Sequence, residues 1–205
     1  MNDKKDKFLF DLHIHTIASY DGKATPQAMC QVAQGRDLNG IAITDHDVLT
    51  RFESPYPGFL VIPGIEVRVE TEVIWADILG IGIQETVPLG LGLAETIDAI
   101  HEAGGLAIVP HPFSKLDNYP AIGDAIHSVA ELIDGVEVTN PKDHVDNARA
   151  RKVANNLNVA KVGGSDAHTI DDVGKGVTVV PPVSSIDELL DLIEAKGCEG
   201  LIRKI

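Results

Sequence analysis

Residues 8–15 read Phe8-Leu9-Phe10-Asp11-Leu12-His13-Ile14-His15, and this stretch decides the fold. Its apolar beginning predicts a short buried strand over about residues 8–13. Alternate residues of a strand point to the same face, so the imidazoles of His13 and His15 can reach one metal ion. An H-x-H pair alone has little specificity, but this pair stands at the C-terminal end of a predicted strand. The stretch therefore predicts a strand that ends in two candidate metal ligands.

Short β-rich runs recur along the rest of the chain, separated by segments with helical periodicity. This alternation predicts an α/β fold in which crossover helices join parallel strands. Eight strand candidates, and a length that accommodates seven or eight β/α units, favour a barrel over a doubly wound open sheet. No linker, repeat or composition break divides the chain, so we expect a single domain over residues 1–205. The strands are predicted at about 8–13, 40–44, 60–66, 76–82, 106–109, 135–138, 159–164 and 176–180.

Four helices have recognisable sequence signals. Thr25-Pro26 combines an N-cap residue with proline at the first helical position, and residues 185–188 (Ser-Ile-Asp-Glu) form a capping box. Residues 93–103 and 143–157 carry helical spacing and end near Gly or Asn. These signals place helices between the strands, as a β/α architecture requires.

Residue types that commonly bind metal ions recur at the ends of the predicted strands. Barrel active sites are built from the C-terminal ends of the strands, so side chains at these ends converge. Five of the eight histidines lie there, whereas His101, His127 and His144 lie in helical or connecting segments and are expected to be solvated or to cap helices. The candidate ligands are His13, His15, His46, Glu66, His111, Asn140, Asp166 and His168.

The chemistry of this set indicates the metal. Imidazole and carboxylate ligands without thiolate suit Mn²⁺, Zn²⁺ or Fe²⁺, whereas Ca²⁺ prefers oxygen ligands alone. The set is too large for one tetrahedral ion, and Glu66 is suited to bridge two ions. Paired ions generate hydroxide from water and stabilise both oxygens of a phosphoryl displacement. The expected reaction is hydrolysis.

Four motifs and a strand-end glutamate occur in a specific order: D-x-H-x-H-T at 11–16, T-D-H at 44–46, Glu66, H-P at 111–112 and S-D-A-H at 165–168. In this set and order the chain resembles the PHP (polymerase and histidinol phosphatase) superfamily of metal-dependent phosphoesterases over nearly its whole length. The resemblance implies a distorted (β/α)₇ barrel with two or three divalent metal ions.

The resemblance also implies how the ligands are shared among the ions. Asp21 stands where many relatives have a histidine, and Asp77 stands where similar phosphatases commonly have a histidine near the substrate phosphate. The expected catalytic residues are Glu66, His111 and Asp166. One ion is expected to bind His13, His15, Glu66 and Asp166; a second, Glu66, His111 and Asn140; and a third, Asp21, His46 and His168.

Charged residues beside these ligands have expected supporting roles. Asp11 and Asp45 precede ligands and are expected to orient imidazoles, with loop capping as the alternative. Arg68, Lys115 and Arg149 are candidate contacts for a phosphate group, although each is also compatible with an ordinary surface charge.

The leading hypothesis for function is hydrolysis of small phosphomonoesters by metal-activated hydroxide. Only residues 112–139 separate His111 from Asn140, which leaves little room for an inserted lid, so we expect an open pocket. Two alternatives remain open. The chain could be a metal-dependent amidohydrolase, since related barrels also activate water for attack on carbonyl groups, or a metal-binding module without turnover.

Composition limits the possible partners and location. A net charge of −14 argues against extended binding of nucleic acid, which needs a basic surface. The apolar runs are too short to span a bilayer, and residues 1–7 lack the features of a signal peptide, so we expect a cytoplasmic location. Cys30 and Cys198 are expected to be reduced structural thiols. The sequence does not indicate an oligomeric state.

Overall fold

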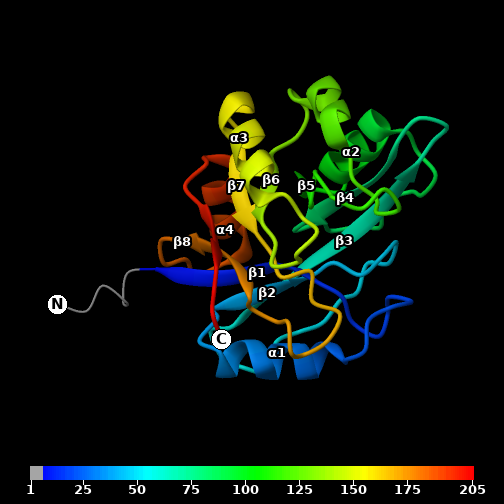
Figure 1. The fold of residues 1–205 in the computed structure, drawn as a ribbon. Helices are drawn as coiled ribbons and strands as arrows, with labels where there is room; N and C mark the ends of the chain where they lie inside the picture. Colours follow the sequence, from blue (N-terminus) through cyan, green and yellow to red (C-terminus); the bar gives the residue numbers. More distant parts are fainter. Residues whose placement is uncertain (1–6) are drawn as a thin grey trace.

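A curved nine-stranded sheet, in the order β7-β6-β5-β4-β3-β2-β1-β8-β9, forms the centre of the protein (Figure 1). The computed structural model describes residues 7–205; of the segment 1–7, in which we expected no signal peptide, only Lys7 is therefore described. The strands are β1 (Phe8–Ile14), β2 (Gly40–Ile43), β3 (Leu60–Glu70), β4 (Trp75–Ile81), β5 (Leu106–Val109), β6 (Gly135–Thr139), β7 (Ala160–Gly163), β8 (Gly176–Val180) and β9 (Glu199–Ile202).

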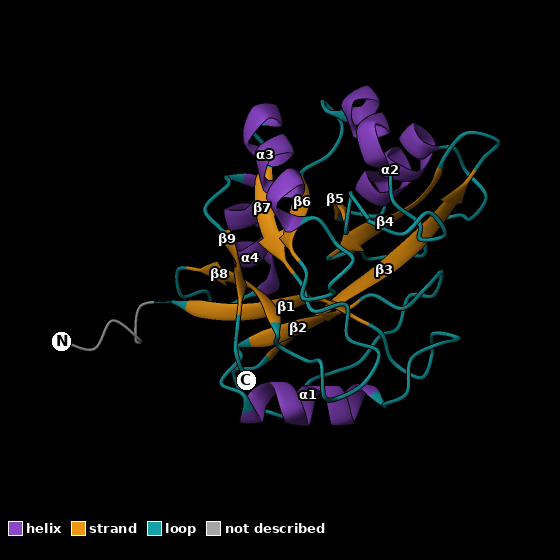
Figure 2. Cartoon of the chain, in the orientation of Figure 1, coloured by secondary structure: helices purple, strands orange, loops and turns teal. Residues whose placement is uncertain are grey.

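The helices lie outside this sheet (Figure 2). They are α1 (Pro26–Gly35), α2 (Leu93–Glu102), α3 (Asn147–Leu157), α4 (Ile186–Glu194) and the 3₁₀ helix η1 (Gly123–Val129). Helix α1 covers the β1–β2 side, while α2 and α3 lie on the opposite side of the molecule. None of the helices within residues 7–205 is long and apolar enough to cross a bilayer.

The sheet is nearly closed into a barrel, in agreement with the predicted α/β barrel. The hydroxyl of Thr178 on β8 receives a hydrogen bond from Gly163 N (2.8 Å) and donates one to Gly163 O (2.9 Å) on β7. Arg151, on α3, also donates to Gly200 O of β9 (3.1 Å). These contacts bring the two ends of the sheet together.

The prediction that the strands are all parallel is wrong for part of the sheet. The pairs β1–β2, β2–β3, β5–β6 and β6–β7 are parallel, but β4 is antiparallel to both of its neighbours, and β8 is antiparallel to β1 and β9. Only residues 71–74 join β3 to β4, closed by a hydrogen bond from Thr71 N to Ile74 O (2.8 Å). Such a short turn allows a hairpin but no crossover.

The helix starts follow the predicted caps closely. The hydroxyl of Thr25 accepts a hydrogen bond from Ala28 N (3.2 Å), and that of Ser185 accepts one from Glu188 N (3.2 Å). The capping box is shifted by one residue, because the Glu188 carboxylate binds Ser184 N. Helix α3 begins at Asn147 rather than near 143, and Asp146 caps it.

Strand direction determines where the site can form. Strands β1, β2, β3, β5, β6 and β7 run the same way, so their C-terminal ends meet at one end of the barrel. Beneath that end, Phe10, Leu12 and Ile62 are fully buried with Ile108 and Leu189 of α4 in one apolar cluster. The apolar cluster makes the barrel a packed core, which leaves its polar end as the place for chemistry.

Candidate metal centre

Glu66 lies at the centre of a cluster of imidazoles. Its Oε1 is 3.4 Å from His13 Nε2 and 3.1 Å from His111 Nε2. Its Oε2 is 3.2 Å from both His15 Nε2 and His46 Nδ1. The predicted strand end at Glu66 is wrong, because β3 continues to Glu70. The carboxylate nevertheless projects into the middle of the cluster, within reach of four imidazoles.

The first ligand group consists of His13, His15 and Asp166, and Glu66 lies beside it, within 3.4 Å of both imidazoles. The two Nε2 atoms are 3.1 Å apart, and Asp166 Oδ1 lies 3.8 Å from the first and 3.5 Å from the second. Bonds to zinc are about 2.0–2.2 Å, so two ligand atoms of one ion lie roughly 3 to 3.5 Å apart. The spacing of this group fits one ion.

Two side chains direct these imidazoles into the site. Glu137 Oε1 is 3.1 Å from His13 Nδ1, and Ser19 Oγ is 3.3 Å from His15 Nδ1. A partner on Nδ1 fixes the tautomer in which the Nε2 lone pair faces an ion. Sequence reasoning missed Glu137. The only signal for it was a carboxylate in the middle of the apolar run 135–139, where it is buried.

The second ligand group consists of His13, Glu66 and His111. The backbone of His111 has φ +27°, a strained conformation for a residue with a side chain, and its N–H donates to Glu137 Oε2 (2.9 Å). Asn140 is buried nearby, but its Nδ2 donates to the same Oε2 (2.9 Å) and its Oδ1 accepts from Lys142 N (3.0 Å). Asn140 thus lies beside the site with its amide engaged by protein groups.

The third ligand group lies nearer to the solvent. Asp21 Oδ2 is 3.0 Å from His168 Nε2 and 3.4 Å from His46 Nε2, and His15 completes the group. Within residues 7–205, Asp21 Oδ1 and His111 Nδ1 are buried polar atoms without a hydrogen-bond partner. Unpartnered ligand-type atoms beside three compact groups fit the binding of divalent ions.

The electrostatics of the cluster favour cations. Burial alone would lower the pKa of His13, but the surrounding carboxylates, led by Glu66, outweigh burial and raise it. The same balance raises the pKa of His15 to about 9. Burial would raise the pKa of Glu66 and Asp166, but the imidazoles, with His13 the largest contributor, lower both. Without metal, protons on the imidazoles balance the negative charge of the carboxylates, and a metal ion has to displace these protons.

The contacts of Asp11 and Asp45 support the alternative of loop capping more than the orientation of imidazoles. Asp11 accepts hydrogen bonds from the backbone N–H groups of His13 (3.3 Å), Ser165 (2.8 Å) and Gly174 (2.7 Å). Asp45 accepts from Thr16 and Ser19 and reaches His15 only through the Ser19 hydroxyl. Both carboxylates hold the loops that carry the ligands, as their position next to backbone turns allows.

The three basic side chains that are candidate contacts for a phosphate group differ in their surroundings. Lys115 Nζ contacts Asp143 O (3.2 Å), and Arg149 pairs with Asp124 (2.7 Å), so protein groups engage both. Arg68 pairs with Asp77, which lies on the neighbouring strand. Burial, together with the charge of Glu66, raises the pKa of Asp77 to about 7, and the pairing with Arg68 opposes that rise. Pairing with the Arg68 cation reduces the repulsion that the Asp77 carboxylate would exert on an anion.

Tyr119 is a further residue that sequence reasoning missed. Its hydroxyl donates to Asp166 Oδ2 (3.2 Å), and its ring meets His111 edge-on with centroids 4.9 Å apart. His144, which we expected to be solvated or to cap a helix, packs on the same ring at 4.4 Å. Tyr119 lies in the loop after β5, where no periodic pattern identifies it.

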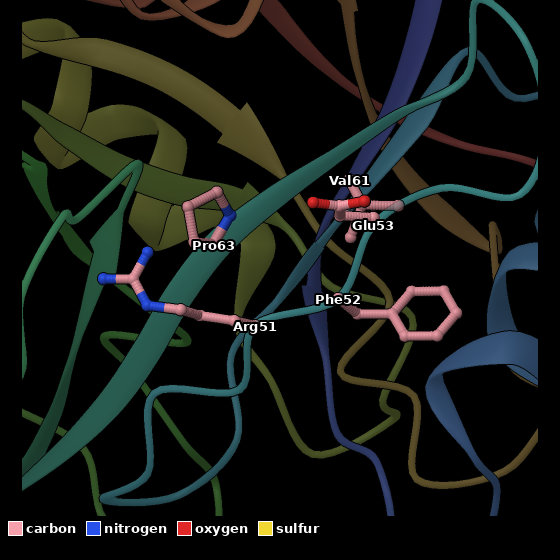
Figure 3. A pocket seen from close by; sticks show the side chains of 5 residues that line it. All are labelled: Arg51, Phe52, Glu53, Val61 and Pro63. Carbon is pink, nitrogen blue, oxygen red and sulfur yellow. The ribbon is translucent and has the colours of Figure 1, made fainter.

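A separate hollow of about 370 Å³ lies beside β3 (Figure 3). It contains none of the predicted ligands. Val61 and Pro63, which precede Glu66 on β3, form one wall, and residues 51–53 form the other. The ligand cluster, rather than this hollow, carries the groups needed for hydrolysis.

Comparison with known proteins agrees with this geometry. Residues 11–161 match the family model described as PHP domain, and residues 144–198 match one described as PHP-associated. An uncharacterized protein of Methanocaldococcus jannaschii is 35% identical over 148 residues, which cover 63% of this chain and 80% of that protein. A probable phosphatase of Shewanella frigidimarina is 29% identical over 247 residues, covering 95% of this chain and 96% of the relative.

Other similar proteins include nucleases. The 5'-3' exoribonuclease Rnm of Escherichia coli is 36% identical over 96 residues, which cover 43% of this chain and 32% of the enzyme. The lesion-specific endonuclease EndoQ of Pyrococcus furiosus has a similar fold, with a TM-score of 0.67 at 18% identity over 95% of this chain and 57% of that structure. This chain therefore spans only part of both nucleases.

The fold is also similar to that of a two-domain Bacteroides vulgatus protein that contains a predicted PHP-like metal-dependent phosphoesterase. The TM-score is 0.74 at 17% identity, over 98% of this chain and 66% of that structure. At such identities the likeness establishes the fold.

Proposed function

The chain belongs to the PHP domain family, and from this premise we propose that it hydrolyses small phosphomonoesters at a centre of two or three divalent metal ions. One protein of similar fold contains a predicted PHP-like metal-dependent phosphoesterase, and this supports phosphoester hydrolysis as the type of reaction. The observation that carries the proposal is the position of Glu66, whose two oxygens lie 3.1–3.4 Å from four imidazoles. A carboxylate in that position is suited to bridge two ions.

The ligand groups supply the proposed ion sites. His13, His15, Glu66 and Asp166 would hold the first ion; Glu66 and His111, with Asn140 beside them, the second; and Asp21, His46 and His168 the third. Imidazole and carboxylate donors suit Mn²⁺, Zn²⁺ or Fe²⁺. When bound, such ions lower the pKa of water to about 7 and so supply hydroxide as a nucleophile at neutral pH.

The protein's own groups prepare the site for this chemistry. Glu137 and Ser19 keep the imidazoles of His13 and His15 oriented, so little reorganisation is needed when substrate arrives. The third ligand group is partly exposed, with 25% of His168 and 30% of Asp21 accessible, so a phosphate group can approach from that side. Glu66, His111 and Asp166 are the residues we propose to be catalytic.

The surroundings of the site support small substrates. The segment between His111 and Asn140 packs Ile122, Ile126 and Val129 into the apolar core, so this part of it is held against the body of the protein. The net charge of −14 disfavours a long polyanion, since each further phosphate adds repulsion. Phosphomonoesters of small metabolites meet both conditions better than polynucleotides.

A hydrolysis screen across Mn²⁺, Zn²⁺, Fe²⁺ and Mg²⁺, with elemental analysis of the purified protein, tests the proposal. We expect kcat/KM for p-nitrophenyl phosphate or a small phosphorylated metabolite to exceed that for single-stranded or duplex DNA. Efficient nuclease activity with negligible monoesterase activity would overturn the size and charge argument. Amide hydrolysis instead would identify an amidohydrolase, and metal binding without any turnover would identify a binding module.

A further inference from the structure

Arg68 lies on the same face of β3 as Glu66. The two residues are two positions apart on a strand, so their side chains point in the same direction. Glu66 is buried, Arg68 is 24% exposed and Glu70 is exposed, so this face of the strand opens gradually toward solvent. A guanidinium in this position stands between the ligand cluster and the solvent.

Asp77 holds this guanidinium by one edge. Arg68 Nε donates to Asp77 Oδ1, and Nη2 donates to Oδ2 (3.2 Å). The two residues are register partners on β3 and β4, and only 2% of the Asp77 side chain is exposed. These two hydrogen bonds use Nε–H and one N–H of Nη2, so the Asp77 carboxylate leaves three of the five guanidinium N–H groups free to donate elsewhere.

One exposed aromatic ring lies beside the guanidinium, and another lies beside the third ligand group. Arg68 Cζ is 5.7 Å from the centroid of Trp75, which is 38% exposed. Tyr20 is 80% exposed, and its ring stacks on His46 of the third ligand group with centroids 5.0 Å apart. Arg68 lies two residues after Glu66 on the same face of β3, so the N–H groups that Asp77 leaves free lie on the side of the strand that carries the ligand cluster.

We propose that Arg68 binds the phosphate group of the substrate and that Asp77 is a positioning residue that fixes the guanidinium for this contact. The free Nη1–Nη2 edge matches two oxygens of a phosphate, a geometry that lysine cannot reproduce. This inference rests on the proposed function in one respect, namely that the ligand carries a phosphate group.

A purely structural role explains the pair less well. Strands β3 and β4 are already joined by seven consecutive register pairs, from Gly64–Ile81 to Glu70–Trp75. An additional ion pair at this place contributes little to the hairpin, and the burial of Asp77 makes it costly to form. A binding role accounts for both the burial of the carboxylate and the free edge of the guanidinium.

Titration of the metal-loaded protein with inorganic phosphate, followed by calorimetry, tests the inference. We expect Arg68→Met to raise the Kd for phosphate by roughly 10- to 100-fold, the effect of one charge-assisted hydrogen bond, with unchanged metal content. Arg68→Lys should retain part of the affinity, and Asp77→Asn should lose less than Arg68→Met. Arg51→Met is the matched control, because this arginine lies at the separate hollow and donates to Gln84 O.

Kinetics separate binding from folding. With a monoester substrate, Arg68→Met should raise KM more than it lowers kcat, and Asp77→Asn should shift KM in the same direction without lowering Tm. If Arg68→Met does not fold, Arg68→Lys and Asp77→Asn carry the test.

Three results would overturn the inference: phosphate affinity of Arg68→Met within twofold of wild type, loss of metal from that variant, or no phosphate binding by the loaded wild type. Failure of the proposed function has a different signature. In that case no ester is hydrolysed, yet phosphate still binds and Arg68→Met still weakens it.

Discussion

Replacing Glu137 by glutamine tests how the protein orients its metal ligands. Glu137 is buried and has three partners: Oε1 faces His13 Nδ1 (3.1 Å), and Oε2 accepts from His111 N and from Asn140 Nδ2 (both 2.9 Å). Glutamine has nearly the same shape but only one oxygen. The substitution therefore changes the hydrogen-bonding pattern and leaves the packing intact.

The size of the effect follows from these contacts. If the glutamine oxygen takes the Oε2 position, its NH₂ group faces His13 Nδ1 and drives the ring proton to Nε2, which removes the lone pair from the metal site. If the amide is flipped, the two donors at His111 and Asn140 lose their acceptor, at about 1–3 kcal/mol each. Loss of an outer partner typically weakens metal binding by roughly 10- to 100-fold. We expect Glu137→Gln to fall in this range, about 1.4 to 2.8 kcal/mol.

Competition with a chelator of known affinity measures this change for Zn²⁺ and Mn²⁺. Glu131→Gln is the matched control, because Glu131 lies on the same segment of chain but is exposed. Circular dichroism establishes that the variant is folded. A metal Kd for folded Glu137→Gln within twofold of wild type would refute the argument that Glu137 sets the His13 tautomer.

Four further outcomes are expected. Glu66→Gln should lower kcat by more than ~10²-fold, because it removes a principal electrostatic element of the site; normal activity with full metal content would contradict its bridging role. Tyr119→Phe should raise the metal Kd roughly tenfold, because Asp166 Oδ2 loses its hydroxyl donor; an unchanged Kd in the chelator competition would count against this contact. Asp11→Asn should lower the free energy of unfolding by about 1–3 kcal/mol in urea titrations, because an NH₂ group replaces one of the two accepting oxygens and leaves at least one backbone N–H without its acceptor; unchanged stability would show that the loops hold without it. Metal-free protein should lose stability as the pH rises from 6.5 to about 9: the pKa of His15 is raised from 6.5 to about 9 on folding, so its contribution is complete below 6.5 and disappears through 9; urea unfolding at pH 6 and 9.5 measures this, and greater stability at the higher pH would contradict it.

The positions of most strands could be predicted because buried strands are apolar runs, but their directions could not. Strand β4 is reversed by the turn Thr71-Glu72-Val73-Ile74, which contains no Gly, Pro or Asn to signal a hairpin. Strand β9 was missed because Glu199-Gly200-Leu201-Ile202 is short and mostly exposed, so it has no apolar run. Periodicity describes the faces of one strand and says nothing about the neighbour with which that strand pairs.

The candidate site also contains residues that could be predicted from the sequence and residues that could not. The convergence of the five clustered histidines could be predicted because each lies near or after the C-terminal end of a strand, and these ends meet at the same end of the barrel. Glu137 and Tyr119 could not, since each matters only through a partner far away in the sequence: His13 for one and Asp166 for the other. A sequence identifies ligand types at strand ends, whereas the groups that orient these ligands depend on tertiary contacts.

The reversed direction of β4 has a consequence for the site itself. The C-terminal end of β4 lies at the opposite end of the barrel, so this strand supplies no ligand from its end. Its beginning lies beside the ligands instead, and Asp77, its third residue, pairs with Arg68 there. If the strand ran the other way over the same span, Leu79 would lie opposite Arg68, which would then have no carboxylate to hold it. The departure from an all-parallel barrel is therefore what places a fixed guanidinium next to the metal ligands.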